Sequence, residues 1–369
     1  MSTVLTDRYA ATLDHDTVLV RRGTRSGLFT MVAVHSTVRG PALGGCRMWH
    51  YDDSRAALRD VLRLSRAMTF KSAVAGLPLG GGKGIILAPD PAAPNRRGLR
   101  ADALRDFGDT VQALGGAYVT AEDVGTSARD MEVIASATSH VSGLSRRRGG
   151  SGDPSPWTAL GVETAIGVCC ERVFGTPSLA GRTIVVAGLG HVGARVARLC
   201  AKAGATLLVT DIDPAKRALA GDLDARWIEP GEAPSAGADV FVPCALGGVL
   251  DHDSVARLGA PIVAGAANNQ LAGDDVADLL ARRGVLWAPD FVVNAGGIIN
   301  ISVELEPAGY DPRRARKRVR GIGDTLRRIF DDAQATSSSP LTAAMALARE
   351  RLAAAAPAPP AATPRDAAA

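Results

Sequence analysis

The sequence predicts an α/β fold of two domains, the second of them built on a parallel, doubly wound sheet. The first observation is the length, because 369 residues are enough for two domains of roughly 150 residues each. The second is a polar stretch rich in glycine and proline, residues 145–156, which is typical of a domain boundary. The third is the alternation of short β-branched runs with helical segments beyond that boundary, which is the pattern of a parallel sheet covered by helices.

The first domain combines strands and helices. Within residues 17–36, the runs TVLVRR and LFTMVAVHS alternate with period two and predict paired strands. Apolar residues at helical spacing predict a helix in DDSRAALRDVLRLSRAMTFKSA, which the glycine cluster 80–82 then breaks. A second helix is predicted over 100–114, before the short strand AYVTAED.

The second domain is predicted from five strand runs, TIVVAG, TLLVTD, VFVPCA, PIVAGA and VLWAP, several of them separated by helices. Two helices are then predicted over 313–333 and 340–354. We expect residues 1–148 to form one domain, completed by the C-terminal helix at about 335–354, and residues 149–334 to form the other. The Ala/Pro tail, residues 355–369, has too few large apolar side chains to order itself.

Composition excludes several classes of protein. Hydrophobic residues make up 46% and charged residues 22%, which is close to the globular average, and no apolar run is long enough to predict a membrane helix. The acidic N-terminal segment does not resemble a secretory signal, so we expect a cytoplasmic protein. Five cysteines without a CxxC pair and six histidines without HExxH predict neither a disulfide framework nor a zinc site.

The charge balance argues against a nucleic-acid partner, because the net charge is only +4. One basic run, RRARKRV over 313–319, is the exception. The helical spacing of the apolar residues after it favours a solvated helix face, and it has neither interleaved aromatic residues nor a reader motif.

A glycine motif opens a helix directly after the strand TIVVA, in the segment Gly188-Leu-Gly190-His-Val-Gly193. In this context GxGxxG indicates a dinucleotide-binding turn, in which the backbone approaches a pyrophosphate at a helix N-terminus. Asp211 ends the next strand about 20 residues later, where it can accept hydrogen bonds from the ribose and would repel a 2′-phosphate. NAD is therefore favoured over NADP, although Lys216 lies nearby. The alternative is a tight turn with a surface aspartate.

A second glycine cluster, 80–82, precedes Lys83. It is not a P-loop, because Gly84 stands where the magnesium-binding hydroxyl would be. It suggests a backbone pressed against a ligand, with Lys83 in a confined cleft. If Lys71 shared that cleft, each lysine would lower the pKa of the other, which is how a lysine becomes a neutral base. Two unrelated surface lysines are the alternative.

Two further polar pairs follow predicted strands. Glu122 and Asp123 end the strand AYVTAED, where carboxylates suit proton transfer and equally suit helix capping. Asn268 and Asn269 follow PIVAGA, at the sheet edge where nucleotide domains bind their ligands. An asparagine-rich turn is the alternative for the second pair.

Seven segments together resemble one family, the amino-acid dehydrogenases of the glutamate/leucine/phenylalanine/valine group. They are GPALGGCRMW, MTFKSAVAGLPLGGGKG, YVTAEDVGT, VAGLGHVG, PCALGG, VAGAANNQLA and APDFVVNAGGIIN, in order and spacing within Val32 to Leu352. The resemblance, closest to the leucine and valine enzymes, implies an N-terminal α/β substrate, catalytic and oligomerisation domain and a Rossmann NAD-binding domain. It implies NAD-dependent reversible deamination of an L-amino acid to a 2-oxo acid, ammonia and NADH. It further implies a homo-oligomer with no metal and with neither nucleic acid nor a membrane as partner.

The resemblance also implies roles for individual residues. Lys83 would be the base that activates water, and Asp123 would exchange protons with the amino group. Lys71 would bind the substrate carboxylate beside Gly44 and Gly45. Cofactor contacts would come from Asn268, which also links the substrate, and from Gly188, Leu189, Gly190, His191, Val192, Gly193, Asp211, Ile212, Lys216, Thr158, Cys244, Ala245 and Asn294.

The expected substrate is a branched-chain aliphatic amino acid. Where the glutamate enzymes hold the side-chain carboxylate with a lysine and a serine, this chain has Leu43 and Ile301, and burying an unpaired carboxylate there would cost several kcal/mol. Phenylalanine enzymes tend to have smaller residues at the positions of Leu43, Ala121 and Ile298. Here Leu43 and Ile298 fill that volume and leave space for a leucine, isoleucine or valine side chain. A phenylalanine dehydrogenase is the alternative, followed by a non-catalytic NAD-binding regulator, which would not need the catalytic lysine and aspartate. Cys46 departs from the family, which usually has threonine there.

Overall fold

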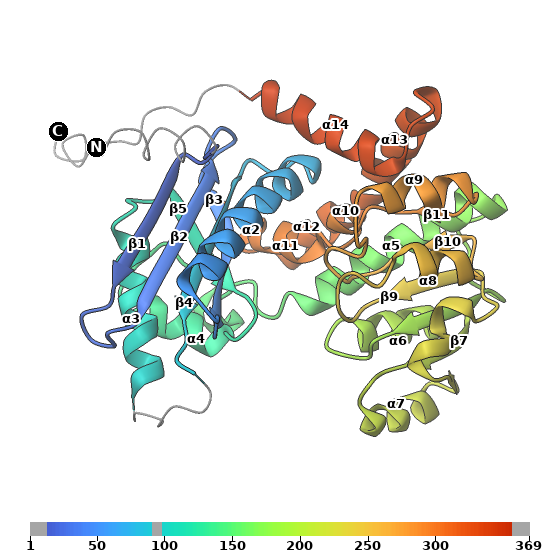
Figure 1. Cartoon of the computed structure of the whole chain (residues 1–369), viewed down its shortest axis with the longest axis horizontal. Helices are drawn as coiled ribbons and strands as arrows, with labels where there is room; N and C mark the ends of the chain where they lie inside the picture. The colour runs from blue at the N-terminus through green and yellow to red at the C-terminus, as the bar shows by residue number, and fades with distance from the viewer. Residues whose placement is uncertain (1–12, 91–97, 356–369) are drawn as a thin grey trace. The chain divides into compact units, whose positions relative to one another are not determined.

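The computed structural model describes residues 13–90 and 98–355, so residues 1–12 and the predicted tail from 356 onward lie outside the described part. The chain divides into two compact units (Figure 1). Unit 1 comprises the described residues up to Gly152, Glu304–Tyr310 and the described residues from Arg349 onward. Unit 2 comprises Asp153–Val303 and Asp311–Ala348.

Helix α14 (Pro340–Ala353) differs from the expectation that the whole C-terminal helix belongs with the first domain. The division between the units falls within it, before Arg349. Leu341, near its start, packs against the apolar core of unit 2. Near its end, Arg351 donates hydrogen bonds to the carbonyl oxygens of Ala73 and Val74 in unit 1. The residues of this helix are therefore divided between the two units.

Unit 1 is built on a five-stranded mixed sheet with the order β1-β2-β4-β3-β5. The strands are β1 (Thr17–Arg22), β2 (Phe29–Ser36), β3 (Ala42–Trp49), β4 (Gly80–Leu87) and β5 (Tyr118–Glu122). Strand β2 is antiparallel to β1 and β4, whereas β3 is parallel to both β4 and β5. The helices are α2 (Ser54–Val74), α3 (Leu99–Gln112), α4 (Ala128–Ile134) and the 3₁₀ helix η1 (Arg146–Arg148).

Both faces of this sheet are covered by helices. Because side chains alternate along a strand, Met31 and Ala33 of β2 pack with Val61 of α2, while Val32 and Val34 pack on the other face with α3 and α4. The paired strands predicted within 17–36 and the helices predicted from periodicity are confirmed.

The glycine cluster 80–82, which was expected to break the preceding helix, lies in a buried strand. Its residues form the start of β4, between β2 and β3. A Cβ atom built on Gly82 would lie 2.6 Å from Cδ2 of Tyr118, whose ring is fully buried against the sheet. The absence of side chains here makes room for packed neighbours.

Unit 2 contains a six-stranded parallel sheet with the order β11-β10-β9-β6-β7-β8, the arrangement of a Rossmann domain. The strands are β6 (Thr183–Ala187), β7 (Thr206–Thr210), β8 (Arg226–Trp227), β9 (Val240–Pro243), β10 (Ile262–Val263) and β11 (Leu286–Trp287). Five of them match the predicted runs, and the two-residue strand β8 was not predicted.

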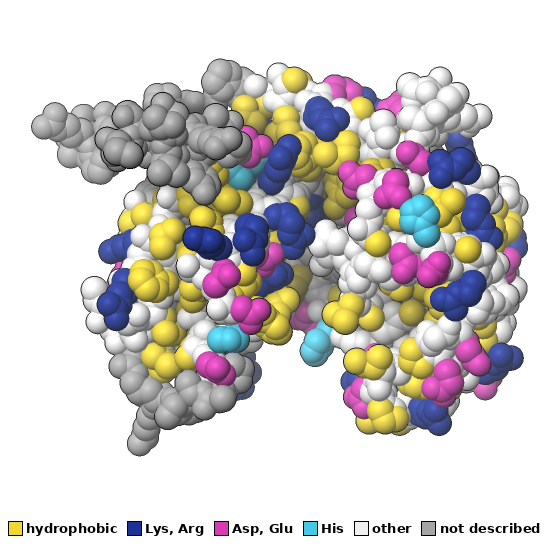
Figure 2. Space-filling view, in the orientation of Figure 1, with side chains coloured by type: hydrophobic (Ala, Val, Ile, Leu, Met, Phe, Trp, Pro, Cys, Tyr) yellow, Lys and Arg dark blue, Asp and Glu magenta, His cyan; other side chains and the backbone are white. Residues whose placement is uncertain are grey.

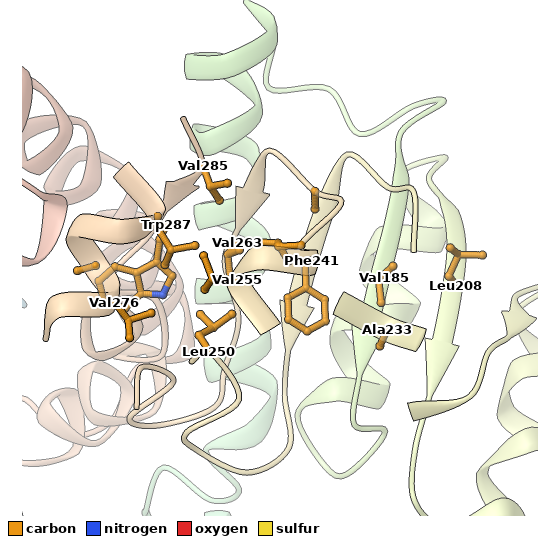
Figure 3. Close-up of a cluster of buried hydrophobic side chains, with 14 of the residues drawn as sticks. Val185, Leu208, Ala233, Phe241, Leu250, Val255, Val263, Val276, Val285 and Trp287 are labelled. Carbon is orange, nitrogen blue, oxygen red and sulfur yellow. The ribbon is translucent and has the colours of Figure 1, made fainter. Parts of the chain in front are cut away.

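Helices surround the sheet of unit 2. They are α5 (Ser155–Phe174), α6 (Gly193–Lys202), α7 (Arg217–Asp222), α8 (His252–Arg257), α9 (Asp275–Arg282), α10 (Asp290–Val293), α11 (Gly296–Glu304), α12 (Pro312–Arg320) and α13 (Ile322–Ala335), with 3₁₀ helices η2 (Pro214–Lys216) and η3 (Pro230–Ser235). One core cluster contains Val185, Phe241 and Val263 of neighbouring strands with Val255 of α8 and Val276 of α9 (Figure 3). These β-branched and aromatic side chains fix the strand ends on which the glycine motif lies.

The single helix predicted over 313–333 is two helices. The break falls at Gly321, whose N–H bonds to the carbonyl of Arg318 three residues earlier, so the chain tightens before α13 begins. Glycine is about 1 kcal/mol less favourable than alanine inside a helix, which explains why the chain breaks there. None of the helices in 13–90 and 98–355 has the length and apolar character needed to cross a membrane. On the face shown in Figure 2, basic and acidic side chains are interspersed over both units.

Candidate active site

Lys83 and Asp123 form a buried ion pair in unit 1. Lys83 lies in β4, paired with Ala33 of β2, and only 4% of the residue is exposed. Its Nζ atom is 2.9 Å from Oδ2 of Asp123, which follows β5 directly. The competing interpretation of Asp123 as a helix cap is wrong, because the N-cap of the next helix, α4, is Ser127.

The surroundings shift the pKa of both groups. Burial lowers the pKa of Lys83, and the positive charge of Arg47 lowers it further, while the carboxylate of Asp123 acts in the opposite direction. For Asp123, burial raises the pKa, but the charges of Lys83 and Arg47 outweigh this effect and leave it lowered. The structure therefore combines a carboxylate that stays ionised with a lysine that loses its proton more readily than an exposed one.

Arg47 was not predicted as a site residue. It lies two positions after Gly45 on β3, and its Nε atom donates to Oδ2 of Asp123 at 2.9 Å. Its Nη1 atom donates to Oδ2 of Asp60 on α2 at 2.8 Å. The signal that could have identified it is strand alternation, because residues two apart in a strand point to the same face. The positive charge of Arg47 lowers the pKa of Lys83.

The predicted substrate-binding residues of unit 1 lie on adjacent strands. Gly44 pairs with Thr120 and Gly45 pairs with Ala121, so the paired glycines lie beside the strand that leads to Asp123. A Cβ atom on Gly45 would lie 2.6 Å from Cβ of Asp123, so only glycine leaves room for that carboxylate. Leu43 is buried on the same strand.

Lys71 and Cys46 are the remaining residues of unit 1 that the sequence analysis singled out. Lys71 is half-buried in the last turn of α2, the helix that packs against β4. Cys46 faces away from the ion pair into the core with Phe107, and burial raises the pKa of its thiol.

In unit 2 the first glycine of the motif lines an open cleft with a cavity volume of about 230 Å³. The lining residues are Ala187, Gly188, Thr210, Asp211, Ile212, Pro230, Pro243, Ala245, Leu246, Gly247 and Val249. The carboxylate of Asp211 accepts hydrogen bonds from the N–H of Leu189 at 2.6 Å and of Asp213 at 2.9 Å. This side chain therefore joins the end of β7 to the glycine turn before α6. Ile212 and Leu246, 88% and 81% exposed, offer apolar surface at the cleft.

The two predicted asparagines of unit 2 are in contact. Nδ2 of Asn294 donates to Oδ1 of Asn268 at 2.8 Å and to the carbonyl of Ala266 at 3.1 Å. Within the described residues, the buried Oδ1 of Asn294 has no hydrogen-bond partner. Gln270, which the sequence did not indicate, holds this loop through the carbonyls of Gly265 and Ala267. Asn268 is exposed, and an asparagine-rich turn alone does not explain its contact with Asn294.

The other predicted cofactor residues occupy different positions in unit 2. Thr158 lies near the start of α5 and is half-buried, and His191 is exposed in the glycine turn. Cys244 directly follows β9, and burial raises the pKa of its thiol to about 12. Lys216 lies in η2 and does not line the cleft. Ile298 and Ile301 lie three residues apart in α11 and are both buried. No group of three or more His, Cys, Asp or Glu side chains in the described part of the chain could hold a metal ion.

Known proteins resemble this chain over most of its length. The family model "Glu/Leu/Phe/Val dehydrogenase, dimerisation domain" matches residues 13–140, and the model "Glutamate/Leucine/Phenylalanine/Valine dehydrogenase" matches residues 210–358. Leucine dehydrogenase of Bacillus subtilis (strain 168) is 42% identical over 347 residues, which cover 94% of this chain and 93% of that protein. This chain belongs to the Glu/Leu/Phe/Val dehydrogenase family.

Other family members lie at a similar distance. Valine dehydrogenase of Streptomyces virginiae is 42% identical over 342 residues, covering 92% of this chain and 94% of that protein. The crystal structure of L-tryptophan dehydrogenase from Nostoc punctiforme superposes with a TM-score of 0.80 at 36% identity, covering 94% of this chain and 98% of that one. The chain is thus an amino-acid dehydrogenase, with aliphatic and aromatic enzymes both among its relatives.

Proposed function

We propose that this enzyme catalyses the NAD-dependent, reversible oxidative deamination of a branched-chain aliphatic L-amino acid to the 2-oxo acid, ammonia and NADH. The observation that carries the proposal is the buried pair of Lys83 with Asp123, 2.9 Å apart, in a member of the amino-acid dehydrogenase family. A regulator that only binds the cofactor has no use for an ion pair of this kind.

The residues of unit 1 suit the proton transfers of the reaction. Neutral Lys83 takes a proton from water as the water oxygen bonds to the iminium carbon of the oxidised substrate, and the protonated lysine can return it when ammonia leaves. Asp123 takes a proton from the substrate ammonium group, because hydride leaves Cα only when the nitrogen carries a lone pair. Lys71 on α2 is proposed to hold the substrate carboxylate, beside Gly44 and Gly45.

The residues of unit 2 fit a dinucleotide. The turn from Gly188 to Gly193 is proposed to receive the pyrophosphate, and Asp211 the adenosine ribose. The unpartnered Oδ1 of Asn294 suits an amide donor such as the nicotinamide carboxamide, with Asn268 beside it. When bound, NAD supplies the acceptor for the hydride from the substrate Cα. Further cofactor contacts are proposed from Thr158, Cys244 and Ala245.

The side-chain preference rests on apolar residues in each unit. Leu43 on β3 and Ile301 on α11 are both buried and uncharged, so a substrate carboxylate would have no partner from either. Ala121 and Ile298 add further apolar surface. Valine is one methylene smaller than leucine and isoleucine, which are isomers of each other. A methylene is worth only about 1–3 kcal/mol in such a pocket, so the proposal is for the class.

The substrate class is tested by measuring NADH formation at alkaline pH with leucine, isoleucine, valine, phenylalanine and glutamate. We expect kcat/KM for the three aliphatic substrates to exceed that for glutamate by at least about a hundredfold, because of the unpaired carboxylate. A preference for phenylalanine would retain the chemistry and overturn the pocket argument. Absence of turnover with all five would favour a cofactor-binding regulator.

Asp211→Ala tests the cofactor choice. Because the carboxylate would repel a 2′-phosphate, we expect its loss to reduce the ratio of kcat/KM with NAD to kcat/KM with NADP by about tenfold or more. Asp213→Ala, which removes a neighbouring carboxylate outside the cleft lining, is the matched control. An unchanged ratio in Asp211→Ala would move the ribose contact to another residue.

We also propose a homo-oligomer in the cytoplasm. Residues 13–140 match a family model described as a dimerisation domain, and Val20 and Phe29 are large apolar side chains, each 46% exposed, at the β1–β2 edge of the sheet. The five cysteines are free thiols, as a reducing compartment allows. Light scattering on the purified protein tests the oligomeric state.

A further inference from the structure

A chain of hydrogen bonds connects the proposed catalytic pair to helix α2, and it rests on Arg47. One side of the guanidinium donates to Oδ2 of Asp123 and the other to Oδ2 of Asp60. Asp60 in turn accepts from the hydroxyl of Tyr51 at 2.7 Å and, on its other oxygen, from Arg63 at 2.9 Å. Arg47 and Asp60 are largely buried, with 21% and 16% of their side chains exposed.

The geometry around Asp123 is asymmetric. Lys83 and Arg47 both bond to Oδ2, and neither bonds to Oδ1. A carboxylate held by two cations through one oxygen has a fixed orientation, and its second oxygen points elsewhere. The flat, rigid fork of an arginine is suited to such a bridge between two carboxylates, whereas the ammonium group of a lysine is not.

We propose that Arg47 is a positioning residue for deamination, which fixes the Asp123 carboxylate between Lys83 and Asp60 and leaves Oδ1 for the substrate amino group. The inference deepens the proposed function and rests on it. Arg47 acts through Asp123 and Lys83 and carries no proton of the reaction itself.

The same arrangement sets the charge balance of the pair. The charged side chains around the pair are Arg47 on β3, which contacts Asp123, and Asp60 on α2 behind Arg47. The Cys46 thiol and the Tyr118 ring lie in the core on the other face of the sheet. Asp123 raises the pKa of Lys83, and Arg47 lowers it. Removing only the guanidinium leaves the carboxylate to act alone, so Lys83 would keep its proton to higher pH.

The first test is the rate of Arg47→Met, which keeps much of the apolar stem and removes the charge and the donors. We expect kcat to fall by about tenfold to a hundredfold, the range for a misplaced catalytic group, with NAD binding unchanged. The pH at which kcat/KM reaches half its maximum should rise by about one unit. Arg47→Lys should restore that pH, because it keeps the charge, and should restore kcat only in part.

The second test does not depend on turnover. The chain has only five lysines, so lysine labelled with ¹³C at Cε gives a spectrum with few signals, and Lys83→Met assigns the one from Lys83. We expect the titration of this signal to move up by about one unit in Arg47→Met. Arg63→Ala is the matched control, because it removes an exposed arginine that bonds to Asp60 and not to Asp123.

The outcomes separate the two proposals. If the Lys83 signal titrates at the same pH in the wild type and in a folded Arg47→Met protein, the proposed role of Arg47 is overturned, whatever the value of kcat. If kcat falls equally in Arg47→Met and Arg47→Lys and the Lys83 titration does not shift, Arg47 serves only the folded structure. That result also overturns the proposed role. If the wild type deaminates none of the five amino acids but the titration still shifts, the proposed function fails while the coupling of Arg47 to Lys83 stands.

Discussion

Lys83→Ala is expected to reduce kcat by at least about a hundredfold while NAD binding persists, which is the typical loss when a general base is removed. Lys83 lies in unit 1, whereas the glycine motif and Asp211 lie in unit 2, so the cofactor residues keep their structure. Asp123 keeps its bond to Arg47, so the variant does not leave an unpaired buried carboxylate.

The measurement is steady-state kcat together with a fluorescence titration of NADH binding. Lys202→Ala, an exposed lysine on α6, is the control and should behave as the wild type. A Lys83→Ala enzyme that retained more than about a hundredth of the wild-type kcat would show that another group activates water. The pH profile of the wild type should agree: deamination requires neutral Lys83, so kcat/KM should rise with pH through the lowered pKa of Lys83.

Asp123→Asn is expected to reduce kcat by about a hundredfold or more, because an amide cannot accept the proton of the substrate ammonium group. This substitution should change the pKa of Lys83 in the direction opposite to the change expected for Arg47→Met. The carboxylate raises the pKa of Lys83, so its loss should lower that pKa and move the Lys83 titration to lower pH.

The ¹³C-lysine titration distinguishes this prediction from simple misfolding. An Asp123→Asn protein with native thermal stability, low kcat and a downward shift would support the assigned role. Asp130→Asn is a useful control, because that aspartate bonds to Arg100 and Ser127 and not to Lys83 or Arg47. Substantial activity in Asp123→Asn would assign the proton exchange with the amino group to another residue.

Unit 2 was largely predictable from the sequence, because its signals are local. Each long strand is a continuous apolar run, and the glycine motif stands directly between a strand and a helix. Asp211 was selected as a candidate because it directly follows the run that forms β7, and its bond to the N–H of Leu189 links it to the glycine turn. The two-residue strand β8 carries too short a pattern to be recognised.

Unit 1 was harder to predict, because its decisive contacts are between distant segments. Residues 80–82 carry no side chains and therefore no periodicity, so the strand that they begin was not predicted. Arg47 bonds to a residue 76 positions away, and nothing local distinguishes it from a surface arginine. Asp123 was recognised as a candidate, but only the structure excludes its alternative role as a helix cap.

The glycine-built strand β4 has a consequence for how this enzyme can change. Gly82 and Gly84 contact the rings of Tyr118 and Phe107 with backbone alone, so any side chain added there collides with the core. Gly45 is restricted in the same way by Asp123. New specificities must therefore arise at neighbouring positions that already carry side chains, such as Leu43 and Ala121. In a library of random substitutions, we expect active variants to accumulate changes at these two positions while the glycines remain invariant.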